Sequence, residues 1–144
     1  MFIQDRGTGR RFFFQVWRKY DQKDVSLDPL EELVLGVILE HPEYHHYLGN
    51  EEQVVDTDFV PEAGQSNPFL HMGMHIAIRE QIGADRPVGI SALYRRLLKK
   101  KSSAAHEVEH AMMECLGESL WIAQRNNTLP DELDYMECLK RLNK

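Results

Sequence analysis

Apolar residues recur every three to four positions along most of the chain, and no stretch alternates apolar and polar residues as a half-buried strand does. This spacing predicts amphipathic α-helices. We therefore predict an all-α fold, a bundle of five to six helices, in a single domain over residues 1–144. The expected helices cover about residues 10–20, 28–41, 67–82, 91–100, 104–124 and 131–142.

The ends of several predicted helices carry recognisable signals. The pairs Asp28-Pro29 and Asn67-Pro68 each place a capping side chain before a proline that suits the first helical turn. Pro42 ends or kinks the second helix, and Gly83 is the expected stop after the third. Residues 49–66 are polar, acidic and without periodicity, which predicts one long loop, a type of segment that is often functional.

Histidine spacing is the most specific chemical feature of the sequence. Six of the seven histidines form three His-x-x-x-His pairs, at 41/45, 71/75 and 106/110. Residues four apart share a helical face. His71 and His75 fall within an apolar stripe of their helix, so we expect both imidazoles to point toward the core. The pair at 41/45 is less certain, because Pro42 interrupts the shared face.

The longest predicted helix carries the second inward-facing pair. His106 and His110 share a face with Gly117, whose lack of a side chain would let a partner helix or a bound group approach closely. Glu114, four residues after His110, borders this face and could add an oxygen donor. The segment HEVEH also fits the zinc-protease pattern H-E-x-x-H, with Glu107 as the base, but no other feature of those enzymes accompanies it.

These pairs lead to the hypothesis of a metal site between helices. Imidazole binds zinc, iron, copper and nickel, and helical bundles build such sites from facing helices. The expected cofactor is a divalent transition metal: zinc, iron or manganese. The sequence leaves two alternatives: a metal-bound water takes part in catalysis, or the ligands fill every position and the metal is structural. It therefore does not decide whether the protein is an enzyme. The first-choice ligands are His71, His75, His110 and Glu114, with His45 and His106 in reserve.

Three long segments resemble a bacterial family of short proteins known only as a domain of unknown function. They read ILEHPEYHHYL, GQSNPFLHMGMHIAIREQI and HEVEHAMMECLGESLWIAQR, and RRFFFQVWRKY near the start also fits. The resemblance implies no activity. It implies that these segments are family hallmarks, carried here by His45, Asn67, Pro68, His71, His75, His110, Glu114 and Gly117. At the level of architecture alone, the site type is similar to that of DinB-like helical bundles, which hold a metal with three histidines.

Charge and composition narrow the other possibilities. The net charge of -6 argues against a nonspecific nucleic-acid binder, and no apolar run approaches the length of a membrane span. The first twenty residues lack the pattern of a secretory signal. Cys115 and Cys138 are interpreted as two reduced thiols of a cytoplasmic protein, although the sequence leaves a disulfide between them open.

Two non-metal hypotheses stay open beside the first. One is an interaction or scaffold protein without catalysis, a possible homo-oligomer, in which the histidines are hydrogen-bonded core groups. The other is an RNA- or ribosome-associated factor that uses the basic cluster at Arg95, Arg96 and residues 99–101. A solvated helix end explains that basic cluster more simply. The partners themselves are unknown from the sequence.

Overall fold

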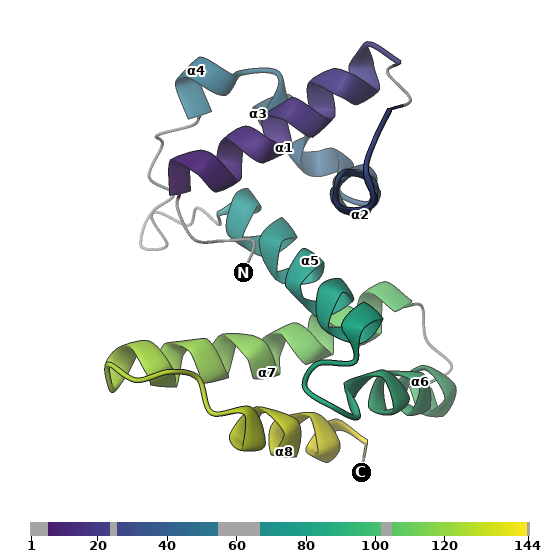
Figure 1. Ribbon diagram of the computed structural model, residues 1–144, viewed down its shortest axis with the longest axis vertical. Helices are drawn as coiled ribbons and strands as arrows, with labels where there is room; N and C mark the ends of the chain where they lie inside the picture. The colour runs from purple at the N-terminus through teal and green to yellow at the C-terminus, as the bar shows by residue number, and fades with distance from the viewer. Residues whose placement is uncertain (1–5, 24–25, 55–66, 102–104, 144) are drawn as a thin grey trace. The chain divides into compact units, whose positions relative to one another are not determined.

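The computed structural model describes residues 6–23, 26–54, 67–101 and 105–143, and within these ranges the chain is helical, without strands (Figure 1). The all-α prediction is confirmed, and the described residues form eight α-helices where five to six were expected. The chain divides into two compact units, Met1–Ala77 and Ile78–Lys144. The elements are α1 (Arg6–Asp21), α2 (Pro29–Leu39), the 3-10 turn η1 (Pro42–Tyr44), α3 (His45–Leu48), α4 (Glu51–Val54), α5 (Pro68–Ala84), α6 (Ile90–Lys101), α7 (Ala105–Arg125) and α8 (Glu132–Leu142).

Both predicted helix caps are present. The Asp28 carboxylate accepts the Glu31 backbone N–H at 2.8 Å, and the Glu31 carboxylate accepts the Asp28 N–H at 3.1 Å, which makes a reciprocal capping box for α2. The Asn67 side-chain oxygen accepts the backbone N–H groups of Phe69 and Leu70 at the start of α5. These bonds satisfy donors that have no partner inside the helix.

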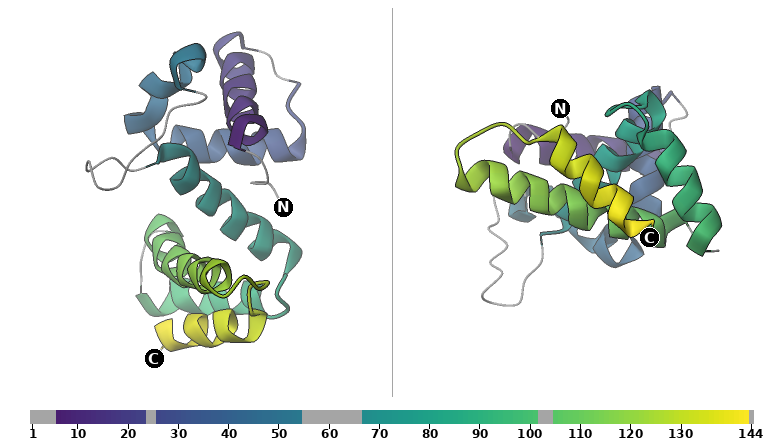
Figure 2. Two further views of the ribbon diagram at one scale, coloured as in Figure 1. Left: turned by 90° about the vertical axis from the view of Figure 1, so that its left-hand side faces the viewer. Right: turned by 90° about the horizontal axis from the view of Figure 1, so that it is seen from below.

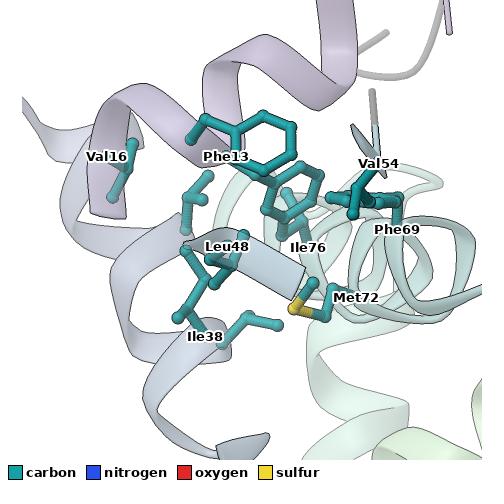
Figure 3. Packing of buried hydrophobic residues seen from close by; sticks show 11 residues of the cluster. Phe13, Val16, Ile38, Leu48, Val54, Phe69, Met72 and Ile76 are labelled. Atoms are coloured by element: carbon teal, nitrogen blue, oxygen red, sulfur yellow. The ribbon is translucent and has the colours of Figure 1, made fainter. Parts of the chain in front are cut away.

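The first unit is built around one hydrophobic cluster, shown close up in Figure 3. Phe13 of α1 meets Phe69 of α5 edge to face, with ring centroids 5.7 Å apart. Side chains from α1, α2, α3, α4 and the start of α5 fill the rest of the cluster. Its buried members are Phe13, Phe14, Val16, Val34, Val37, Ile38, Leu48, Val54, Phe69, Met72 and Ile76.

The stretch predicted as one loop over residues 49–66 contains an element that its polar sequence does not indicate. Glu51–Val54 forms the single-turn helix α4, because Val54 is buried in the hydrophobic cluster and its carbonyl accepts a hydrogen bond from Arg10 Nη1 at 3.1 Å. Tertiary packing therefore overrides weak local propensity here. Residues 55–66 of the predicted loop lie outside the described part of the chain.

The second unit contains α6, α7, α8 and the last turns of α5. The helices α7 and α8 run side by side in Figures 1 and 2. Tyr135 and Leu139 are the buried residues of α8, and the Tyr135 hydroxyl donates to Gln81 Oε1 at 2.6 Å. The α8 helix is thus held to α5 by a polar contact as well as by apolar packing.

Cys115 of α7 and Cys138 of α8 form a disulfide, with Cα atoms 5.8 Å apart. This corrects the interpretation of two reduced thiols. The sequence separation of 23 residues gave no sign of pairing, since the two residues meet only once α8 packs against α7. The cytoplasmic assignment rested partly on reduced thiols, and it stays a prediction.

The stop expected at Gly83 is also corrected, since α5 continues through Gly83 to Ala84. The chain reverses one residue later, at Asp85, which has a positive φ of 51°. The Asp85 carboxylate accepts the backbone N–H groups of Gly89 and Ser91 and so organises the turn into α6. Aspartate is one of the residues that tolerate a left-handed conformation, so Asp85 ends the helix in place of Gly83.

Candidate metal centre

His71 and His75 lie one turn apart on α5, with ring centroids 4.9 Å apart and the rings nearly perpendicular at 71°. The His75 side chain is completely buried, and that of His71 is half-buried. The two imidazoles therefore share one face of α5, as the helical spacing predicts, and this face is directed into the protein.

A third imidazole joins them from a distant part of the sequence. His41 follows the end of α2, is 1% exposed, and has its ring centroid 5.1 Å from that of His71 and 4.8 Å from that of His75. One ring nitrogen from each of these three histidines lies within 4.8 Å of the others. Two nitrogens that bind one ion at about 2.0–2.1 Å each are at most about 4.2 Å apart, so small side-chain rotations would bring these nitrogens onto a shared ion. We call His41, His71 and His75 the histidine cluster.

The protonation of the His41 ring follows from its hydrogen bond. His41 Nδ1 lies 2.7 Å from the Val37 carbonyl oxygen, which can only accept a hydrogen bond. Nδ1 therefore carries the proton, and in the neutral ring the buried Nε2 keeps its lone pair. Metal-binding histidines usually donate their second ring N–H to a carbonyl or carboxylate in this manner, which fixes both tautomer and ring orientation.

His45, the reserve ligand that the sequence favoured from this pair, has a different environment. Its Nε2 lies 2.7 Å from the Ile38 carbonyl oxygen, and its ring packs on Trp17 with centroids 4.6 Å apart. The ring thereby satisfies a carbonyl in the last turn of α2. His41 was not among the expected ligands, although its spacing from His45 placed it in one of the three His-x-x-x-His pairs. The turn at Pro42 separates the two rings, so that His41 and not His45 joins the histidine cluster.

The other predicted ligands belong to α7 in the second unit. The rings of His106 and His110 are 4.3 Å apart between centroids, so the two share a face of α7 as predicted. Glu114 and Glu107 are exposed on the same helix. The roles of His106, His110 and Glu114 as metal ligands stay predictions.

Tyr44 covers one side of the histidine cluster. Its ring lies parallel to that of His41, at an interplanar angle of 3° and a centroid distance of 5.6 Å, and its centroid is 6.1 Å from that of His71. The 3-10 turn η1 brings Tyr44 back over His41. Partial burial raises the pKa of the Tyr44 hydroxyl, and the nearby Glu43 carboxylate adds to this effect, followed by Tyr47.

Both buried carboxylates in the described part of the chain form ion pairs with basic side chains. Glu31 accepts from Lys19 Nζ at 2.8 Å. Glu109 accepts from Arg79 Nε at 3.0 and 3.2 Å. Both glutamates are less than 5% exposed, and an ion pair is what makes such burial tolerable. The residues that the structure groups as potential metal ligands are histidines alone.

The fold and this site define a helical protein with a buried histidine cluster. The family model described as a domain of unknown function, DUF1841, matches residues 5–141, and the chain belongs to this family. No curated protein and no solved structure matches the chain. Within the described residues, every helix is too short or too polar to cross a membrane.

Proposed function

We propose that this protein binds one divalent transition-metal ion, with His41, His71 and His75 as ligands. The observation that carries the proposal is the convergence of three imidazoles whose ring nitrogens lie within 4.8 Å of one another, two of them on completely buried residues. The Val37 carbonyl orients the His41 ring so that Nε2 keeps its lone pair. A ligand preorganised in this way loses little conformational freedom on binding.

We include His110 as a fourth ligand. In the second unit, the rings of His106 and His110 share one face of α7, with centroids 4.3 Å apart. The His106/His110 pair of the sequence supports the same assignment, with His106 as its reserve.

Zinc and iron are the metals we propose first. Imidazole nitrogen suits both ions, whereas manganese prefers oxygen donors. The carboxylate that would have favoured manganese, Glu114, is exposed. A bundle that holds one ion with imidazoles from separate helices is a known use of this architecture.

Elemental analysis of untagged protein, purified without chelator or nickel resin, tests the proposal. We expect close to one equivalent of metal in the wild type, and loss of most of it in His41→Ala and His75→Ala. His46→Ala is the matched control, because His46 is an exposed histidine in the same segment as His41. Far-UV circular dichroism shows whether each variant is folded. If an alanine variant does not fold, the milder variant His75→Gln is measured instead. Folded ligand variants that keep full metal content would refute the assignment.

An interaction protein is the second candidate, and one observation favours it. Large apolar side chains are exposed around the turn from α7 to α8: Trp121 at 57%, Leu129 at 89% and Leu133 at 79%. Contiguous exposed apolar surface often marks a binding site. Sedimentation over a range of concentrations, with and without chelator, distinguishes the two candidates. This second function requires self-association or partner binding that does not depend on metal.

A further inference from the structure

We propose that the metal-loaded histidine cluster also takes up a small monovalent anion, which binds at or beside the metal ion. This inference rests on the proposed function and names a second ligand for the same site. It follows from the balance of charge around the histidine cluster.

The ligands of the histidine cluster bring no negative charge. The described residues that could share one ion are all histidines, and a metal-binding imidazole is neutral. A divalent ion would therefore place two positive charges among side chains that include the completely buried His75 and the 1% exposed His41. Buried charge without a counter-charge is strongly unfavourable, so the site favours an anion that enters with the metal.

The buried carboxylates cannot provide this counter-charge without losing their present partners. Glu31 is held by Lys19 and also accepts the backbone N–H of Asp28. Both carboxylate oxygens of Glu109 accept from Arg79 Nε, Oε1 at 3.2 Å and Oε2 at 3.0 Å. Moving either carboxylate to the metal would leave a cation without its anion, at a similar electrostatic cost.

The half-buried Tyr44 marks the side of the histidine cluster that an anion can reach. Its ring stands next to both His41 and His71, and a phenol is neutral near pH 7, so it supplies no charge of its own. Glu43 is exposed, where water screens its charge.

Cobalt(II) and azide provide a direct test. One equivalent of cobalt(II) is added to the full chain in chloride-free buffer, and its visible absorption bands report binding. Azide is then titrated. We expect a saturable change in the bands and a tighter cobalt affinity in the presence of azide, because the two ligands must strengthen each other reciprocally. Failure to bind cobalt overturns both the proposed function and this inference. Cobalt binding that azide leaves unaltered overturns the inference alone.

A pair of variants tests whether charge is the reason. Tyr44→Glu places a carboxylate beside the histidine cluster. Tyr44→Gln places a neutral side chain there that has the same shape as glutamate. We expect azide affinity to be at least about tenfold weaker in the Glu variant than in the Gln variant, because the carboxylate already compensates the metal and repels the anion. Equal azide affinities in the two cobalt-loaded variants would overturn the charge argument.

Discussion

Removing the Cys115–Cys138 disulfide should lower the stability of the second unit by a predictable amount. The bond closes a loop with a sequence separation of 23 residues between α7 and α8. Closing a loop of this size removes conformational entropy from the unfolded chain that corresponds to about 3 kcal/mol at 25 °C. This loss is large compared with the 5–15 kcal/mol by which a whole domain is typically stable, at roughly a fifth to three fifths of that value.

The perturbation is best made in two ways. Cys115 is 2% exposed, so Cys115→Ala avoids burying a new hydroxyl, whereas Cys138 is less buried and Cys138→Ser suits it. The double variant removes the bond permanently. Reduction of the wild type with a dithiol removes the bond without any substitution, and the double variant serves as its control because reductant should not affect it.

Thermal unfolding followed by circular dichroism or calorimetry measures the effect. For a chain of 144 residues we expect the midpoint to fall by about 10 °C. Titration of free thiols must show two per chain after reduction and none before it. If the reduced wild type has two free thiols yet melts within about 2 °C of the oxidised protein, the entropic reasoning is wrong.

Two further predictions concern the carboxylates that organise helix ends and turns. Asp28→Ala removes the side chain that accepts the Glu31 N–H, and urea unfolding should show a loss of about 1 kcal/mol, whereas Asp28→Asn should retain most of the stability. Backbone hydrogen bonding from Ser91, and to a lesser extent from Gly89, lowers the pKa of Asp85 below its ordinary value of 3.8. A lowered folded-state pKa stabilises the protein above the unfolded-state pKa, and this contribution is lost as the pH falls through the folded-state value. The carboxyl carbon of Asp85 should therefore titrate below the ordinary value in NMR, and Asp85→Asn should weaken the acid dependence of stability; an ordinary titration would contradict the hydrogen-bonded turn.

The positions of the longer helices and the two capped helix starts follow from local sequence, and the structure confirms them, although α1 begins at Arg6 and not near residue 10. Asp28 and Asn67 cap the helices that they were expected to cap, because a capping side chain acts on backbone groups two or three residues away. The common face of His71 and His75 is equally local, since one helical turn determines it. For such features the sequence alone is sufficient.

Contacts between distant segments depend on tertiary structure. The disulfide requires α8 to lie against α7, and α4 forms because Val54 packs into the hydrophobic cluster. The choice between His41 and His45 is of the same kind. It depends on the turn after α2, which directs His41 to α5 and His45 to the Ile38 carbonyl. Periodicity describes which face of one helix a residue occupies, and only the packed chain determines which side chains from separate elements meet on that face.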